Sequence, residues 1–288
     1  MSDSPDSRER PLIGSGASAS KRRTLYPFFQ RESETVLSIA GAIATALDTE
    51  LLIGEVETGT GTPAYETSRD VAETVLHARN KLPDDLDVLG QTLTGPSPIE
   101  TVDTATARFH VNTIVLGDDT SERLEAQIAK RTGCDTVVVS ESPESGSVAS
   151  ILVPIAGGEH SGAAVDVASA VAAATGAWLE LVHVLEPSDA RLSRPEATAL
   201  LEAGAARVPD TVDVDTRIID DDDVTSEIIE QSGYHDVTVI GAPQKGRLRR
   251  FVFGSTTATI REEAPNTVAM ARKGSDPERS LFAGPLDW

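Results

Sequence analysis

The chain carries the same order of sequence elements twice, and this repeat constrains the fold more than any other feature. In each half, short apolar runs typical of strands alternate with helical patterns that place their apolar residues on one stripe. Pro27 and Pro154 hold matching places in the first strand of each half, and Gly117 and Gly241 each end the fourth strand. Alternating strands and helices predict a parallel sheet with helices on both faces. The sequence therefore predicts an α/β protein of two tandem five-stranded units.

The same patterns give the expected element and domain bounds. Strands are expected at 24–29, 51–56, 87–94, 113–116, 136–140, 151–155, 178–185, 212–219, 237–240 and 267–271. The two domains are predicted at 23–142 and 149–273, with a flexible arm at 1–22 and a tail at 274–288. The tail carries an apolar load that is unusual for a solvated chain end, namely Leu281, Phe282, Leu286 and Trp288. We therefore expect the tail to dock on the body or on a partner.

The charge balance is strongly acidic, with 46 Asp and Glu against 25 Lys and Arg and a formal net charge of −21. Such a surface repels phosphate backbones, which argues against binding to nucleic acid or to anionic membranes. Salt would screen the self-repulsion, so the composition favours a cytoplasm with molar salt, as in extreme halophiles; an ordinary soluble acidic protein is the alternative. No apolar run reaches the ~18 residues of a membrane span, and the first residues lack the apolar core of a signal peptide. We expect a cytoplasmic protein without membrane insertion.

Several other residue patterns predict structure rather than chemistry. Cys134 is the only cysteine, so it cannot form an intrachain disulfide, and we expect it to be buried. The acidic run Asp220–Asp223 precedes a helix, whose dipole favours carboxylates at that end; metal binding is the alternative. His183 lies in an apolar strand and is expected in the core. The five histidines show no metal-ligand spacing, so no metal site is predicted.

The loop after the fourth strand of the second half is the main candidate for a ligand site. Residues 241–256 read GAPQKGRLRRFVFGST, a strand end followed by a glycine-containing loop and a helix that opens near Gly254. Ligands of such sheets bind beyond the carboxyl ends of the strands, and small residues at a helix N-terminus favour an anion. The cations of this loop add positive charge; pairing with acidic neighbours is the alternative. The loop has no GK[ST], so it is not the P-loop of kinases and ATPases.

This loop resembles the Gly-x2-Gly-x9-Gly-Ser/Thr signature of universal stress protein (UspA-type) domains. The run ILVPIAGGEHSGAAVDVASAVAAATGAWLELVHVLEP and the closing NTVAMARK also resemble that family, strongly across 151–273 and more weakly across 24–140. The resemblance implies five-stranded parallel units of the adenine-nucleotide α-hydrolase-like type, dimeric or in tandem, with ATP and Mg²⁺ bound in some members. By this resemblance, Pro154, Ile155, Ala156 and Val184 border the base and ribose. The loop itself predicts a phosphate cradle of Gly241, Gly246, Gly254, Ser255 and Thr256, with charge from Lys245 and Arg247, and Ile240 directly before it completes the candidate ligand site.

The sequence departs from the family pattern in both halves. Gln244 stands where the second glycine belongs, with Gly246 two residues later, and Ala156 stands where the nucleotide binders carry an Asp. A missing contact of this kind weakens binding by about 1–3 kcal/mol. The first half has a shorter loop in which Asp118 and Asp119 stand where phosphate would sit. We expect the first half to be a structural partner without a nucleotide.

Two functions are consistent with these observations. The first is a universal-stress-type regulatory protein that binds ATP or another adenine nucleotide through its second domain and has no catalytic role. The second is a module without any cofactor, in which the two halves pack as a pseudo-dimer and act on a partner such as a membrane transporter or its regulator. A homodimer is a further expected assembly. A hydrolase of the wider adenine-nucleotide group is disfavoured because an acid and base pair is missing.

Overall fold

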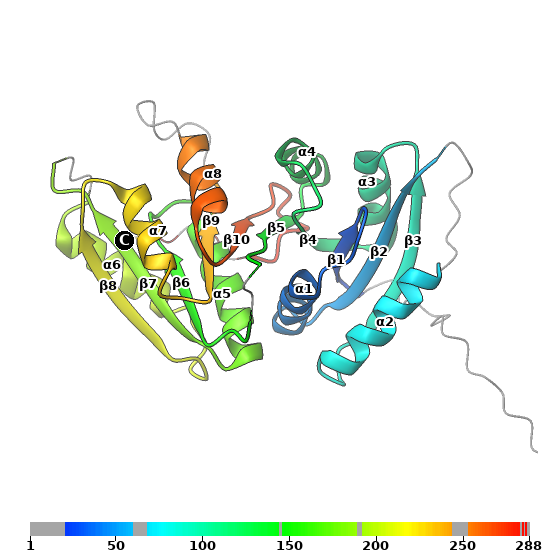
Figure 1. Cartoon of the computed structure of the whole chain (residues 1–288), viewed down its shortest axis with the longest axis horizontal. Coiled ribbons are helices and arrows are strands. Elements are labelled where there is room, and N and C mark those ends of the chain that lie inside the picture. The colour runs from blue at the N-terminus through cyan, green and yellow to red at the C-terminus, as the bar shows by residue number, and fades with distance from the viewer. Residues whose placement is uncertain are drawn as a thin grey trace, which may run out of the picture.

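The computed structural model describes residues 21–59, 68–143, 146–188, 192–243, 253–282, 284 and 286, except for the side chains of residues 253–255. These residues form a ten-stranded sheet with the order β3-β2-β1-β4-β5-β10-β9-β6-β7-β8. Every described strand pair is parallel except β5 with β10, which is antiparallel. Figure 1 shows the two halves side by side along this sheet. The predicted α/β class with parallel five-stranded units is confirmed.

Each half contributes five strands and four helices in the same chain order. The first half comprises β1 (Arg23–Phe28), α1 (Glu34–Ala46), β2 (Glu50–Thr58), α2 (Arg69–Lys81), β3 (Val88–Gly95), α3 (Pro98–Phe109), β4 (Val111–Leu116), α4 (Glu122–Thr132) and β5 (Asp135–Ser140). The second half comprises β6 (Ser150–Pro154), α5 (Ser161–Thr175), β7 (Trp178–Leu185), α6 (Arg194–Ala205), β8 (Val214–Asp220), α7 (Val224–Ser232), β9 (Val237–Gly241), α8 (Phe253–Glu263) and β10 (Thr267–Arg272). All ten predicted strands are present, with bounds close to those expected.

Local sequence explains where the helices of the first half begin. Ser33, Ser68, Ser97 and Ser121 precede α1 to α4, and each side chain accepts a hydrogen bond from a backbone N–H in the first helical turn. Such serine caps satisfy donors that a helix cannot pair internally. In the second half, Asp223 caps α7 in the same way, which confirms the structural interpretation of the acidic run.

The helices form two layers, one on each face of the sheet. The buried side chains of α1, α2, α5 and α6 share one apolar cluster, and those of α3, α4, α7 and α8 share the other. Cys134 is fully buried with its thiol beside Val111 O, and His183 Nδ1 lies 2.7 Å from Ile155 O. Both residues therefore have the core positions that were predicted. Among the described residues, no helix is long and apolar enough to cross a membrane.

The predicted arm and the predicted domain boundary fall partly outside the described residues. Residues 1–20 and 144–145 are not described. Lys21, placed in the arm by the sequence, forms an ion pair of 2.6 Å with Asp87. The last part of the predicted arm thus contacts the first half.

One ion pair joins the two halves beside the β5–β10 pairing. The Arg261 guanidinium of α8 donates to both carboxylate oxygens of Glu125 on α4, at 3.0 and 3.1 Å, and its Nε donates to Ser140 Oγ. The Glu125 side chain is only 5% exposed and that of Arg261 12%. A bidentate pair in this position fixes α4 relative to α8.

We predict that Arg261→Met destabilises the fold, because it leaves the Glu125 carboxylate buried without its partner. The expected loss in the free energy of unfolding is about 3–5 kcal/mol, measured by urea unfolding at a KCl concentration where the wild type is folded. The double variant Glu125→Leu with Arg261→Met should regain most of that loss. Arg69→Met is the matched control, because the Arg69–Glu73 pair is exposed and should contribute nothing measurable. Equal losses in Arg261→Met and Arg69→Met would contradict the prediction.

Candidate functional site

The candidate ligand edge is where β6 and β9 end side by side. The order β10-β9-β6-β7-β8 makes this the switch point of the second half, because the chain leaves β6 toward one side and β9 toward the other. After β6 the chain passes through Gly157 and Gly158, whose φ angles are 77° and 95°. Such angles favour glycine, which explains the two adjacent glycines before α5.

The backbone beyond β6 is firmly tied to its neighbours. Ile155 N donates to Val182 O at 2.7 Å, and Ser161 Oγ donates to Gly157 O at 2.9 Å. Ile155 is buried whereas Ala156 is exposed. The residue that replaces the family's aspartate therefore lies at the surface of this edge, and it offers no carboxylate to a sugar.

Gly241 ends β9 against the start of α5. A Cβ at this position would lie 3.0 Å from His160 O, so the glycine allows the two backbones to approach. His160 is buried, and its Nδ1 accepts a hydrogen bond from Lys273 N at 3.2 Å. Burial, followed by the charge of Arg272, lowers the pKa of His160. A neutral ring is consistent with Nδ1 as an acceptor.

The opening of α8 is described only in part. Gly254 and Ser255 lie in its first turn, and the Thr225 hydroxyl donates to Thr256 Oγ1 at 3.3 Å. Thr256 therefore already has a partner on α7. The predicted residues Lys245, Gly246 and Arg247, together with Gln244, lie outside the described residues.

The structure distributes the predicted site residues of the strands over both faces of the sheet. Ile155 belongs to the apolar cluster under α5 and α6. Val184 and Ile240 belong to the cluster under α7 and α8. Pro154, at the end of β6, is half-buried. These side chains thus surround the strand ends without facing a common space.

The equivalent edge of the first half holds a carboxylate of its own. Asp119 Oδ2 accepts hydrogen bonds from Phe29 N at 2.8 Å and Gln30 N at 3.2 Å, directly after β1. Asp119 thus lies at the switch point, whereas Asp118 is exposed. In the repeat, Pro243 takes the place of Asp119 in the second half, so that half has no such carboxylate.

The tail is anchored to the first half by Asp135. The sequence predicted that the tail would dock, but not which residue would bind it. Asp135 on β5 is fully buried, and its carboxylate accepts hydrogen bonds from Gly274 N, Ser280 Oγ, Leu281 N and Phe282 N at 2.5–2.9 Å. The four donors all belong to the tail. A carboxylate of the first half therefore anchors the chain that follows the last strand of the second half.

From this anchor the tail reaches the candidate edge. Leu286 forms an isolated antiparallel bridge with Gly158, and Arg207 donates to Gly284 O at 2.9 Å. Phe282 and Leu286 are 3% and 1% exposed. The expected docking on the body is confirmed for these residues, whereas Trp288 lies outside the described residues. No sequence motif marks Asp135, so its role as the anchor of the tail is evident only from its burial in the structure.

We predict that removal of residues 275–288 lowers stability, because the burial of two apolar side chains is lost. The expected loss is about 3 kcal/mol or more at ~1.5–3 kcal/mol for each side chain. Asp135→Asn should also destabilise, because an amide accepts fewer of the four donors, while the exposed Asp118→Asn serves as the control. Thermal unfolding in KCl measures all three proteins. A truncated chain that melts at the wild-type temperature would show that the tail does not stabilise the body.

Comparison with known proteins places this geometry in a known fold. The model of the universal stress protein family matches residues 148–272. A universal stress protein of Archaeoglobus fulgidus aligns with a TM-score of 0.55 and 15% identity, over 88% of this chain and 97% of its own. The cytoplasmic domain of a prokaryotic cation chloride cotransporter aligns with a TM-score of 0.53 and 11% identity, over 87% and 95%. No curated protein matches the chain. At these identities the likeness shows the fold alone, and it extends over both halves.

Proposed function

We propose, on the premise that residues 148–272 belong to the universal stress protein family, that the chain is a regulatory protein whose second half binds an adenine nucleotide. ATP with Mg²⁺ is the form we propose, bound at the carboxyl edge of β6 and β9. The first half would support this site without binding a nucleotide itself. We assign the protein no catalytic step, and we place it in a cytoplasm of high salt because of its net charge of −21.

The difference between the two switch points carries this proposal. In the first half, Asp119 already occupies the backbone donors after β1, and its charge would repel a phosphate. In the second half, Pro243 replaces that carboxylate and Ala156 is exposed. An anion would therefore meet the Asp119 carboxylate at the first edge, whereas Pro243 offers no carboxylate at the corresponding position of the second.

The described residues fit the phosphate end of a nucleotide better than the nucleoside end. The first turn of α8 offers a helix N-terminus with small residues, which favours an anion. Lys245 and Arg247 would add charge to the same loop. At the other end, Ala156 gives no carboxylate to the ribose, and the tail residue Leu286 pairs beside it at Gly158. We therefore expect binding to depend on the phosphates more than on the base.

The second candidate function is a nucleotide-free module that acts on a partner such as a membrane transporter. The docked tail favours it, because Leu286 covers part of the backbone on which a nucleoside would rest. The solved cotransporter domain has the same fold across both halves. A homodimer of the whole chain would be a further way to present such a surface.

We predict that ATP with Mg²⁺ raises the melting temperature of the wild type by several degrees, because a ligand that binds only the folded state stabilises it. Differential scanning at molar KCl with millimolar ATP, AMP and cyclic AMP is the measurement. Gly254→Arg should abolish the shift by filling the helix opening. Gly146→Arg is the matched control, since no atom lies within 4 Å of a Cβ at Gly146.

The outcomes separate the two functions. A shift that survives in Gly254→Arg would move the nucleotide to another place in the chain. No shift with any of the three nucleotides would reject the nucleotide proposal and favour the partner-binding module. Because phosphates are expected to dominate, ATP should give a larger shift than AMP.

A further inference from the structure

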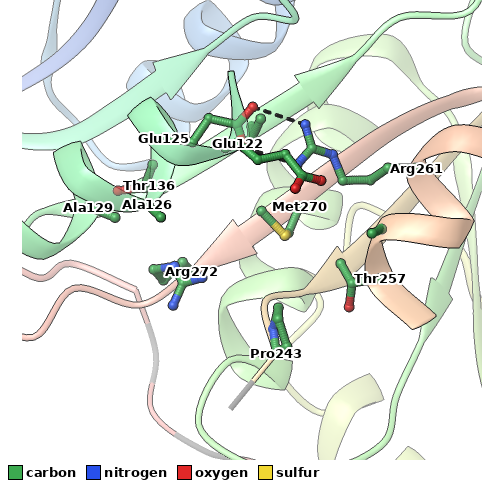
Figure 2. Close-up of a pocket in the computed structure, with 12 residues that line it drawn as sticks. Glu122, Glu125, Ala126, Ala129, Thr136, Pro243, Thr257, Arg261, Met270 and Arg272 are labelled. Carbon is green, nitrogen blue, oxygen red and sulfur yellow. Dashed lines mark hydrogen bonds and ion pairs between the residues drawn. The ribbon is translucent and has the colours of Figure 1, made fainter. Parts of the chain in front are cut away.

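A cavity of about 190 Å³ lies between the two halves, over the β5–β10 pairing. Its floor consists of paired residues of the two strands, Thr136 with Arg272 and Val138 with Met270. These residues alternate along their strands, so all four side chains point to the same face of the sheet. The walls come from α4 of the first half and α8 of the second, with Pro243 at one end (Figure 2). Neither half alone would form this space.

The two ends of the cavity differ in charge. At one end, Arg261 is fully engaged by Glu125 and Ser140, and Glu122 lies beside that pair (Figure 2). Arg272 lies at the other end, because its partner Thr136 is four residues before Ser140 on β5, which corresponds to about 13 Å. The acidic side chains that line the cavity, Glu122 and Glu125, are therefore gathered away from Arg272.

Arg272 has no hydrogen-bond or ion-pair partner among the described residues, although its side chain is partly buried. Burial lowers the pKa of Arg272, and the charge of Glu159 raises it by a smaller amount. A guanidinium carries five donors, and leaving them unpaired in a partly buried place costs free energy. Thr136 and Thr257 line the same cavity, although the Thr136 hydroxyl already donates to Cys134 O, and α8 begins at this end. This end is thus prepared to receive an oxyanion.

The remaining lining is apolar and limits the size of a ligand. Met270, Val138, Ala126 and Ala129 form the surface between the two charged ends. At about 30 Å³ for each water molecule in the liquid, the cavity holds about six waters. A ligand of six to ten non-hydrogen atoms, with one oxyanion and an apolar body, is therefore the best match. Glu122 in the lining disfavours a ligand with several negative charges at this cavity.

We propose that this cavity binds a small monocarboxylate, with the carboxylate on Arg272 and the apolar body over Met270. This site is separate from the proposed nucleotide edge and does not depend on it. Because both halves line the site, a bound carboxylate would stabilise their association. The cavity would then couple a small metabolite to the arrangement of the two halves.

The chain offers a direct probe, because Met270 and Met1 are its only methionines. Protein labelled with ¹³C-methyl methionine gives two methyl signals, and Met270→Leu assigns them. We expect isobutyrate to shift the Met270 signal in a saturable manner. Isobutyramide, which has nearly the same shape but no charge, should not shift it. Arg272→Gln should abolish the effect of isobutyrate, whereas the control Arg131→Gln, at an exposed arginine on α4, should preserve it.

Each alternative result overturns the proposal. Equal shifts with the acid and the amide would show that Arg272 does not select the charge. A shift that persists in Arg272→Gln, or no saturable shift in the wild type, would exclude the site. If Arg272→Gln does not fold, the comparison of acid with amide on the wild type decides alone. An Arg272-dependent shift caused by ATP instead of isobutyrate would assign the cavity to the nucleotide.

Discussion

The antiparallel pairing of β5 with β10 is the interaction on which the rest of the structure depends. Each half ends with a strand at the edge of its own sheet, and an unpaired edge exposes backbone donors and acceptors that invite association. Pairing β5 with β10 over Thr136–Ser140 and Arg272–Val268 satisfies both edges at once. It also brings α1 against α5 and α4 opposite α8. Two layered units thereby become one continuous sheet.

The contacts between the two halves that are described above lie beside this pairing. The ion pair between Glu125 and Arg261 spans it on one face. Asp135, the first residue of β5, holds the tail that follows β10, because antiparallel strands place the start of one beside the end of the other. The cavity with Arg272 lies over the same strands. The tail then carries the connection on to Gly158, at the candidate ligand edge of the second half.

The two halves have the same order of strands and helices, but their switch points differ. In the first, the shortened loop delivers Asp119 to the donors after β1, so an internal carboxylate closes the switch point. In the second, glycines allow α5 to approach β9 closely, and no carboxylate takes the corresponding place. The presence of Asp119 at only one of the two switch points is important because the chain is strongly negative. An anionic ligand would need a binding place without nearby carboxylates.

The sequence by itself determined the elements and their kind. The alternation of apolar runs and helical stripes predicted all ten strands, and the loop position of Asp119 indicated a carboxylate at the switch point of the first half. Periodicity and caps are local properties, so they can be read from neighbouring residues. The sequence did not show which strand edges would pair or that Asp135 would anchor the tail. It also did not show that Val184 and Ile155 would lie on opposite faces of the sheet, or that Arg272 would line a cavity. Those facts depend on contacts between residues far apart in the chain, and only the packing of the two halves decides them.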